Sequence, residues 1–254
     1  METKNILGID VGASGIKGAI VDIEKGTLLT ERVKLSTPKP ATPEAVAGVV
    51  AEVAKLTGYN GKLMGCGFPA IVSHGVAYSA ANIHESWIGT NIETLLAGTT
   101  GLDVVALNDA DAAGMAEMRY GKGRGQSGTV LLITIGSGLG SALFTDGHLV
   151  RNSELGHLHL HGFVAEHYIS NTARKKYEMT WVGFGKRFNE YLHHIERLFF
   201  PDLVIIGGGI SNDFDQFSPY IDVKTKVTTA GAFNQAGITG AALYAYETRF
   251  GQTG

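Results

Sequence analysis

One pattern occurs twice in this chain: an apolar strand, a glycine-rich turn and a second apolar strand. The first copy covers residues 6–22 (ILGIDVGASGIKGAIVD), and the second covers residues 130–144 (VLLITIGSGLGSALF). Since glycine permits the positive φ angles of tight reversals, each copy predicts a β-hairpin, whereas a P-loop would continue into a helix. The repeat predicts two related α/β domains, each opening with a hairpin whose turn faces a common cleft.

The segments outside the hairpins alternate between strand-like and helix-like patterns. Apolar residues recur at helical spacing over residues 43–56, and Thr42 is the expected N-cap of that helix. Further strands are expected at 62–68, 103–107 and 203–206, and further helices at 110–119 and 237–248. The expected fold class is therefore α/β.

Composition and charge exclude several classes of protein. Hydrophobic residues make up 44% of the 254 residues, and the formal net charge is -3. Neither disorder nor general binding to nucleic acid or anionic membranes is therefore expected. The longest charge-free stretch, residues 125–145, is broken by glycines and would make a poor membrane helix. The single cysteine, Cys66, can form neither an intrachain disulfide nor a multi-thiolate zinc site, which favours a cytoplasmic location.

Three glycine turns follow apolar strands, at residues 12–15, 136–140 and 207–209. Turns without side chains let peptide N–H groups approach oxyanions, so phosphate is the expected ligand. One such turn is usually a plain reversal, but three of them in a repeated layout favour anion binding. Asp10, at the end of the first strand, could hold a magnesium ion through water, or it could simply cap the turn.

A polar pair follows the strand at residues 103–107. Asp109 stands where the strand gives way to a helix, which is the edge at which open α/β sheets bind their ligands. There it could act as a general base, or it could be the N-cap of the helix, a common role of aspartate. Asn108 offers a donor and an acceptor together, as a sugar hydroxyl requires. The pair therefore favours a base that activates a hydroxyl for phosphoryl transfer.

Histidines and glutamates gather after the second hairpin. They are Glu154, His157, His159, His161, Glu166 and His167. The first three histidines alternate, so on a strand they would share one face, where a metal site must be considered. Because no thiolate lies nearby in the sequence, a structural metal is the weaker interpretation.

Together these segments resemble the ROK family of sugar kinases, members of the actin and hexokinase-like superfamily. The motifs that carry the resemblance span nearly the whole chain and occur in this order: IDVGASGIKG, LNDADAAGMAE, ITIGSGLGSAL, ELGH and VIIGGGIS. Residues 68–89, FPAIVSHGVAYSAANIHESWIG, and the absence of a cysteine cluster are similar to the branch that uses inorganic polyphosphate to phosphorylate glucose.

The resemblance implies two ribonuclease H-like (actin/hexokinase-like) domains that flank an active-site cleft. The expected small N-terminal domain covers residues 1–107, and the larger C-terminal domain covers residues 108–240. A C-terminal helix at 241–254 is expected to pack back on the first domain. The resemblance also implies a homodimer in the cytoplasm.

Roles for individual residues follow from the same resemblance. Asp109 is implied to be the catalytic base. The residues implied to hold glucose hydroxyls are Asn82, Asn108, Glu154, His157 and Glu166. The implied phosphate- or nucleotide-binding positions are Asp10, Gly12, Ser14, Gly15, Lys17, Thr134, Gly136, Ser137, Gly138, Gly208 and Gly209.

The chain departs from the family pattern at two places. Ala13 stands where the family usually has a second glycine, and its methyl group would be strained if φ were positive. The three cysteines of the family's zinc motif are missing. No structural zinc is therefore expected, and the region around Glu166 must be organised by packing.

The implied activity is that of a glucokinase that transfers a phosphoryl group from polyphosphate, ATP or both to the 6-hydroxyl of glucose, with Mg2+. Three basic residues near the end of the helix at 110–119 could form a track for polyphosphate or a solvated face: Arg119, Lys122 and Arg124. A strictly ATP-dependent kinase for mannose, fructose or N-acylmannosamine is the alternative. A sugar sensor without catalysis would not need the carboxylate of Asp109.

Overall fold

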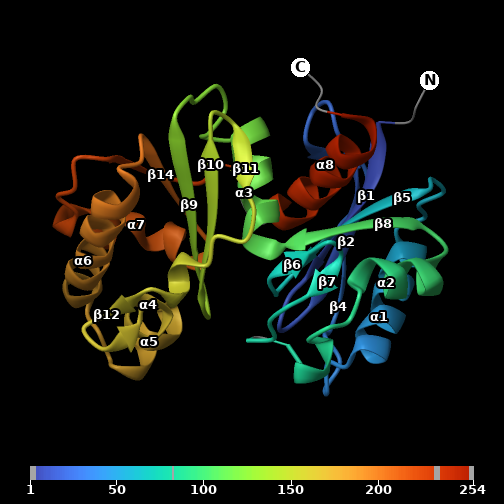
Figure 1. The fold of residues 1–254 in the computed structure, drawn as a ribbon, viewed down its shortest axis with the longest axis horizontal. Helices are drawn as coiled ribbons and strands as arrows, with labels where there is room; N and C mark the ends of the chain where they lie inside the picture. The colour runs from blue at the N-terminus through green and yellow to red at the C-terminus, as the bar shows by residue number, and fades with distance from the viewer. Residues whose placement is uncertain (1–3, 82, 232–234, 252–254) are drawn as a thin grey trace. The chain divides into compact units, whose positions relative to one another are not determined.

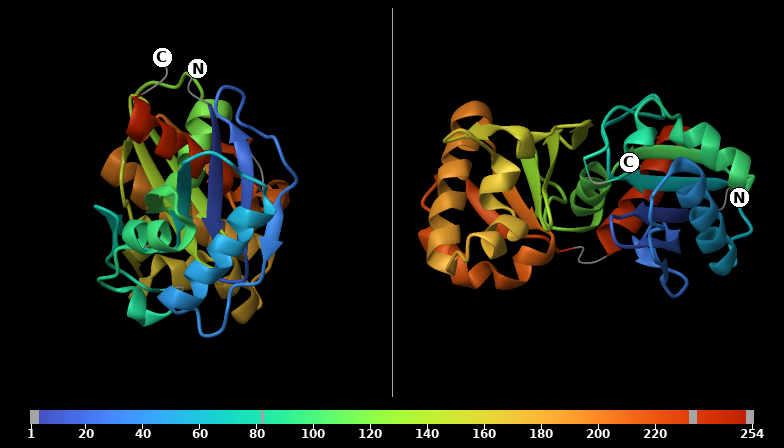
Figure 2. Two further views of the ribbon diagram at one scale, coloured as in Figure 1. Left: turned by 90° about the vertical axis from the view of Figure 1, so that its right-hand side faces the viewer. Right: turned by 90° about the horizontal axis from the view of Figure 1, so that it is seen from below.

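The computed structural model describes residues 4–81, 83–231 and 235–251 (Figures 1 and 2). The chain forms two compact units: unit 1 comprises Met1–Ala116 together with Gln235–Gly254, and unit 2 comprises Glu117–Asn234. Each unit has a central β-sheet with helices packed against it, so the predicted α/β class is confirmed. The division between the units falls inside helix α3 (Asp109–Tyr120).

Six of the described strands form the sheet of unit 1. Their bounds are Asn5–Val11 (β1), Ile16–Asp22 (β2), Thr27–Leu28 (β3), Val33–Leu35 (β4), Leu63–Phe68 (β5) and Asp103–Asn108 (β8). The order is β3-β2-β1-β5-β8, and β4 pairs with β2. β1 and β2 form the predicted hairpin, in which Asp10 pairs with Lys17, whereas β1, β5 and β8 run parallel. A separate small hairpin joins β6 (Val72–Ser73) to β7 (Val76–Ala77).

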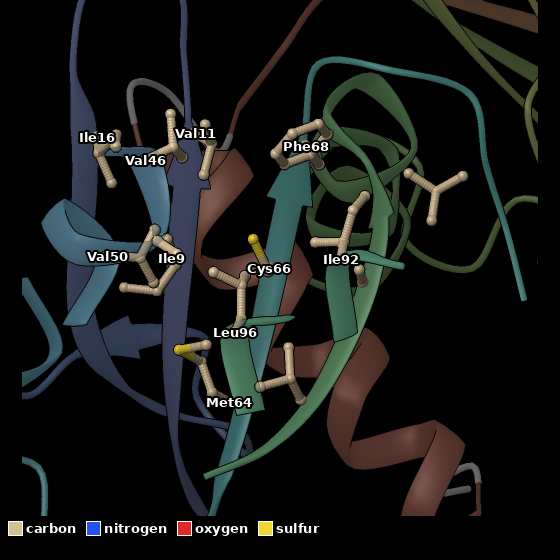
Figure 3. Packing of buried hydrophobic residues seen from close by; sticks show 14 of the residues in the cluster. Ile9, Val11, Ile16, Val46, Val50, Met64, Cys66, Phe68, Ile92 and Leu96 are labelled. Atoms are coloured by element: carbon tan, nitrogen blue, oxygen red, sulfur yellow. The ribbon is translucent and has the colours of Figure 1, made fainter. Parts of the chain in front are cut away.

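Two helices cover one face of this sheet. α1 (Pro43–Leu56) begins at the predicted N-cap, where the hydroxyl of Thr42 accepts a hydrogen bond from the N–H of Ala45. α1 and α2 (Ile92–Thr100) enclose the main core of unit 1 with the large side chains of β1 and β5 (Figure 3). The short 3-10 helix η1 (Glu85–Trp87) adds the fully buried indole ring of its last residue to this core.

Helix α8 (Ala236–Phe250) packs on the opposite face, against glycines of β1 and β5. Because strand residues alternate between faces, Gly8 and Gly65 point to α8 while their neighbours point to α1 and α2. A Cβ atom at Gly8 would lie 2.1 Å from the carbonyl oxygen of Ile238, and one at Gly65 would lie 1.9 Å from that of Ala241. The helix backbone therefore lies directly on the strand backbones, which only glycine permits.

The sheet of unit 2 repeats the plan of the first. Its strands are Thr129–Ile135 (β9), Leu139–Thr145 (β10), His148–Val150 (β11), Leu203–Gly207 (β14) and Lys226–Thr229 (β15). They lie in the order β11-β10-β9-β14-β15. β9 and β10 form the second predicted hairpin, and β9, β14 and β15 run parallel.

Helices and short turns complete unit 2. They are η2 (Leu155–His157), α4 (Ala165–Ile169), α5 (Asn171–Lys176), α6 (Trp181–Phe199), η3 (Gly209–Asp213), α7 (Phe214–Phe217) and η4 (Ser218–Tyr220). The aromatic rings of Phe184 and Phe188 in α6 pack against Phe217 of α7 at the centre of its core. No helix within the described ranges is long and apolar enough to cross a membrane.

The sequence suggested that the alternating histidines share one face of a strand. The structure shows that they do not. His157 ends η2, His159 begins the two-residue strand β12 (His159–Leu160), and His161 occupies the following turn with a φ of 51°. Among the described strands, β12 pairs with β13 (Phe163–Val164) alone, so the local chain is a tight hairpin rather than one extended strand. In the part of the chain that the structure describes, no three His, Cys, Asp or Glu side chains are grouped to hold a metal ion.

Candidate active site

Three parallel strands of unit 1 end at the same edge of its sheet. Asp10 in β1 stands beside Gly67 of β5, and Phe68 at the end of β5 stands beside Asn108 of β8. Open α/β sheets bind their ligands outside the carboxyl ends of such strands. This edge therefore brings together the residue predicted for magnesium, Asp10, and the predicted base, Asp109, which directly follows β8.

The carboxylate of Asp10 forms an ion pair with Lys17 and lies near the N-terminus of α8. Its Oδ2 atom lies 2.8 Å from Nζ of Lys17, and 18% of its side chain is exposed. A Cβ atom at Gly237, in the first turn of α8, would lie 3.0 Å from the carboxyl carbon of Asp10. The N-terminal backbone of α8 therefore comes close to this carboxylate. The partial positive charge at the N-terminus of the helix attracts the negative carboxylate.

The chemistry of this edge fits the magnesium ion that the sequence resemblance implies. Mg2+ is usually bound by one or two carboxylates, several waters and the phosphates of a substrate. Asp10 supplies one carboxylate beside the first glycine turn, so a hydrated ion would be completed by a bound phosphate. Oxygen donors suit magnesium, whereas structural zinc is usually held by cysteine and histidine.

The first glycine turn is built without positive φ angles. The N–H of Gly12 donates to the carbonyl of Gly15 at 3.1 Å, and Ala13 and Ser14 at the tip are exposed. None of residues 12–15 has a positive φ. The strain that a positive φ would cause at Ala13 is therefore absent, and the prediction that this reversal uses positive φ angles was wrong.

Asn108 and Asp109 share the start of α3. The Oδ1 atom of Asn108 accepts the N–H groups of Ala110 and Asp111 at 2.8 and 3.1 Å, and its Nδ2 atom donates to the carbonyl of Ala70 at 3.1 Å. Asn108 is therefore the N-cap, a role that the sequence also allowed for Asp109. The Oδ1 atom of Asp109 accepts the N–H of Ala110 at 2.8 Å, and the residue is half-buried. Its carboxylate is fixed at the N-terminus of the helix.

The second glycine turn joins β9 to β10 and is supported by a side chain from α4. The N–H of Gly136 donates to the carbonyl of Gly138 at 3.0 Å, and Ser137 at the tip is exposed. The carboxylate of Glu166 accepts the N–H of Leu139 at 3.0 Å, where the turn enters β10. Glu166 therefore braces the predicted phosphate turn, a contact that the sequence did not reveal.

The third glycine turn lies next to the second. β14 runs beside β9, with Gly207 opposite Thr134. Gly208 has a φ of 78°, and a Cβ atom there would lie 2.5 Å from the carbonyl oxygen of Ile135. Gly209 follows as the first residue of η3. Two of the predicted phosphate turns therefore share one edge of the sheet of unit 2.

The predicted sugar ligands of unit 2 surround the start of β10. The Oε2 atom of Glu154 lies 3.4 Å from Nδ1 of His157, and both side chains are partly exposed. Between them, Gly156 packs so closely that a Cβ atom would lie 2.1 Å from the carbonyl oxygen of Leu139. Glu166 bonds the N–H of the same leucine. Contacts to Leu139 thus gather the three predicted ligands next to the second glycine turn.

The structure does not assign a role to the remaining predicted residues. Asn82 lies outside the described residues, so its contact with the sugar stays a prediction. Lys122 and Arg124 are exposed in the loop after α3, and Arg119 is half-buried in the last turn of that helix. Exposed basic side chains suit a polyphosphate track and a solvated face equally well, so the track also stays a prediction.

Sequence reasoning missed Glu117, a residue of α3 that is only 1% exposed. Its Oε2 atom accepts the N–H groups of Lys122 at 3.1 Å and Gly231 at 3.0 Å. The sequence did hold a signal for it. Glu117 follows the buried Ala110 by two helical turns, which puts an acidic side chain on an otherwise apolar helix face.

The chain is similar to known proteins over most of its length. The model of the ROK family matches residues 6–169. The polyphosphate glucokinase of Mycobacterium tuberculosis (strain CDC 1551 / Oshkosh) is 47% identical over 237 residues, which cover 93% of this chain and 89% of that protein.

Solved structures give the same result. The inorganic polyphosphate/ATP-glucomannokinase from Arthrobacter sp. strain KM matches with a TM-score of 0.92 and 46% identity, over 97% of this chain and 100% of that one. A ROK family glucokinase from Streptomyces griseus, solved with glucose and AMPPNP, matches with a TM-score of 0.83 over 96% of this chain and 99% of that one. At 23% identity, this second match shows a common fold.

Proposed function

This chain belongs to the ROK family, and from that membership we propose that it is a glucokinase. It transfers a phosphoryl group from inorganic polyphosphate, ATP or both to the 6-hydroxyl of glucose. The observation that carries the proposal is the 47% identity to a polyphosphate glucokinase over 93% of this chain. The 46% identity to a polyphosphate/ATP-glucomannokinase supports the same pair of donors.

Asp109 is the catalytic base in this proposal. As the 6-hydroxyl oxygen attacks the terminal phosphorus of the donor, the carboxylate accepts the hydroxyl proton, and the bridging oxygen of the donor leaves with its electron pair. The capping bonds of Asn108 support the assignment, because they satisfy the helix backbone with a neighbouring side chain. The bond from the N–H of Ala110 to Asp109 fixes the carboxylate at the strand edge.

The glycine turns bind the phosphates of the donor. Their backbone N–H groups at residues 12–15, 136–138 and 208–209 are fixed dipoles, which stabilise the charge on the transferred group without reorganisation. Lys17, which pairs with Asp10, adds positive charge beside the first turn, and Thr134 lies at the end of β9. Mg2+ held through water by Asp10 would neutralise further charge on the phosphates.

Polar side chains from both units bind the hydroxyl groups of the sugar. In unit 2 these are Glu154, His157 and Glu166, which lie around the start of β10. In unit 1 they are Asn82 and Asn108. Nδ2 of Asn108 carries two N–H groups, one of which bonds the carbonyl of Ala70, and the other is the group offered to a hydroxyl.

The proposal extends to the arrangement of the molecule. In this proposal each of the two units is a ribonuclease H-like domain of the actin/hexokinase type. The hairpin that opens each sheet supports their relationship. Family membership supports a homodimer, and the single cysteine supports a cytoplasmic location.

Mannose is a second candidate substrate. The Arthrobacter protein, which is 46% identical to this chain, is a glucomannokinase. Mannose differs from glucose in the configuration of one hydroxyl group, so few contacts can separate the two sugars.

An assay of sugar phosphate formation tests the proposal. Purified protein with Mg2+ receives glucose or mannose, and polyphosphate or ATP is supplied separately. We expect glucose 6-phosphate with polyphosphate. Turnover with ATP alone would make the protein an ATP-dependent hexose kinase. No turnover with any pair would contradict kinase activity and favour a sugar sensor.

A further inference from the structure

Glu117 ties together two segments that are far apart in the sequence. Its Oε2 atom accepts the N–H groups of Lys122 and of Gly231, and the second bond spans 114 positions of the chain. A buried carboxylate is costly unless hydrogen bonds compensate for the lost water, and bonds to a charged acceptor are about twice as strong as neutral ones. Glu117 therefore holds the start of the 121–126 loop firmly to the segment after β15.

The packing around this carboxylate places the side chain of Lys122. A Cβ atom at Gly121 would lie 2.1 Å from Oε2 of Glu117, so the loop approaches the carboxylate as closely as a glycine allows. A Cβ atom at Gly231 would lie 3.6 Å from Cγ of Lys122 and 3.7 Å from its Cε. The aliphatic stem of Lys122 therefore runs over Gly231, which lies two residues beyond the end of β15.

The end of β15 belongs to the same edge as the second and third glycine turns. β9, β14 and β15 are parallel neighbours, so their carboxyl ends form a row with a spacing of about 4.8 Å. The turns at 136–138 and 208–209 follow the first two strands, and Gly231 follows the third. Through its bond to the N–H of Lys122, Glu117 thus brings a lysine side chain to a row of strand ends whose glycine turns offer backbone N–H groups.

We propose that Glu117 is a positioning residue for the phosphoryl donor. It fixes Lys122 at the carboxyl end of β15, where the ammonium group binds a phosphate beyond the one that is transferred. A linear polyphosphate would then run across the ends of β9, β14 and β15 in turn. This inference rests on the proposed function, and it assigns the donor side of the site a direction along the sheet edge.

Variants at Glu117 and Lys122 test the inference with long-chain polyphosphate. Glu117→Ala removes the acceptor of both N–H groups and should raise the KM for polyphosphate roughly tenfold, the loss of one charged contact. The kcat and the KM for glucose should change less than about twofold by the same argument, since neither depends on that contact. Glu117→Gln keeps an acceptor oxygen and should restore most of the affinity. Lys122→Ala should match Glu117→Ala, and the double variant should add little to either.

A direct binding measurement separates positioning from general destabilisation. The slope of log Kd for polyphosphate against log salt should fall by roughly one in Lys122→Ala and in Glu117→Ala, because one phosphate contact is lost. Glu196→Gln is the matched control. The Oε1 atom of Glu196 accepts the N–H and the hydroxyl of Thr225 at 2.7 and 2.8 Å, at the opposite end of β15, so this variant should leave the slope unchanged.

Failure of the inference differs from failure of the proposed function. The wild-type protein alone decides whether glucose is phosphorylated and by which donor. Given turnover, additive effects of the two substitutions, an unchanged slope in Lys122→Ala, or an equal rise in the KM for glucose would overturn the role of Glu117. If Glu117→Ala does not fold, Glu117→Asp in the wild-type and Lys122→Ala backgrounds decides, because the shorter side chain cannot reach both N–H groups. Weaker polyphosphate binding in the first background but not in the second supports coupling, and equal effects in both backgrounds overturn it.

Discussion

At the scale of single residues, two adjacent polar side chains at the start of α3, Asn108 and Asp109, have different roles. The amide of Asn108 bonds the backbone of Ala110, Asp111 and Ala70, so it stabilises the helix and the strand end. Such a cap contributes about 1 kcal/mol. Asp109 follows inside the helix, half-buried at the strand edge. Loss of Asn108 should therefore lower stability, whereas loss of the Asp109 carboxylate should lower the rate of reaction.

Replacing Asp109 with asparagine should lower kcat at least ~100-fold, the smaller end of what removal of a general base costs. Asparagine keeps the acceptor that bonds the N–H of Ala110, so the free energy of unfolding and the Kd for glucose should change little. Steady-state kinetics and calorimetric titration with glucose measure the two effects. Asp146→Asn is the control, because Asp146 accepts the N–H of Gly128 at 2.8 Å in unit 2. A kcat above half of the wild-type value would refute the assignment.

The sequence predicted where these polar residues lie but not which groups they contact. Asparagine and aspartate are equally good N-caps, so no local rule decides between positions 108 and 109. The bond between Glu166 and Leu139 joins residues 27 positions apart, and only the folded chain brings them together. The first turn shows the same limit: its glycines were predicted to supply positive φ angles, and the chain reverses without them.

At the scale of elements, the contact between α8 and the sheet of unit 1 depends on the absence of side chains. Gly8 and Gly65 lie under the carbonyl groups of α8, and Gly240 of α8 lies against α3, where a Cβ atom would be 1.6 Å from the carbonyl oxygen of Ala112. Close-packed backbones leave no space for even a methyl group. The helix is therefore held in one position on the sheet.

Gly65→Ala should destabilise the protein by about 1–3 kcal/mol or more, because the new methyl group forces the helix away from β5. Gly48→Ala is the matched control in α1. A Cβ atom there would meet nothing within 4 Å, so this change should stabilise the protein by about 0.4–1 kcal/mol. Urea unfolding measures both. Equal effects of the two substitutions would show that α8 does not depend on the glycine contact.

The other end of α8 is fixed by a charged pair whose contribution depends on pH. Arg249 donates two hydrogen bonds to Asp103 at 2.7 and 2.8 Å, and these bonds lower the pKa of Asp103 from its ordinary value of 3.8. A lowered pKa in the folded state gives stability that is present above pH 3.8 and is lost as the pH falls through the lowered value. Both side chains are more than a third exposed, so the pair should contribute less than about 1 kcal/mol.

Arg249→Gln should therefore lower the free energy of unfolding slightly at pH 7 and have a much smaller effect near pH 3, below the ordinary pKa of Asp103. Urea titrations at the two pH values measure the difference. Arg197→Gln removes a basic residue from the last turn of α6 and serves as the control for the helix dipole. A loss of stability that is the same at both pH values would exclude the pair with Asp103 as its cause.

The elements that the sequence predicted are those with enough residues to show a period. Both hairpins, the strands β5, β8 and β14, and the helix α1 with its cap Thr42 all lie where the apolar pattern put them. β12 and β13 have two residues each, so they carry no period of their own. Their pairing with one another, rather than with a larger sheet, is set by contacts between neighbouring segments.

At the scale of the whole molecule, the charge on the chain limits how it can hold its donor. The net charge is only -3, so no overall positive field attracts a polyanion. Polyphosphate must be held by local contacts, each of which displaces a counterion from the polymer. Long donors make more of these contacts than ATP does.

Polyphosphate use should therefore be more sensitive to salt than ATP use. We expect the KM for polyphosphate to rise more steeply with sodium chloride than the KM for ATP, because more counterions are released on binding. Initial rates at several salt concentrations give both slopes, and the KM for uncharged glucose is the internal control. Equal slopes for the two donors would limit the donor contacts to those that ATP also makes.

Unit 1 is made from the two ends of the chain, which sets an order on its synthesis. The strands of Met1–Ala116 leave the ribosome before unit 2, but α8 lies in Gln235–Gly254 and leaves after it. All of Glu117–Asn234 is translated in between, which takes on the order of ten seconds. During that interval the glycine-lined face of β1 and β5 is not covered by α8. We therefore expect chaperones to bind that face of the nascent chain until α8 has emerged.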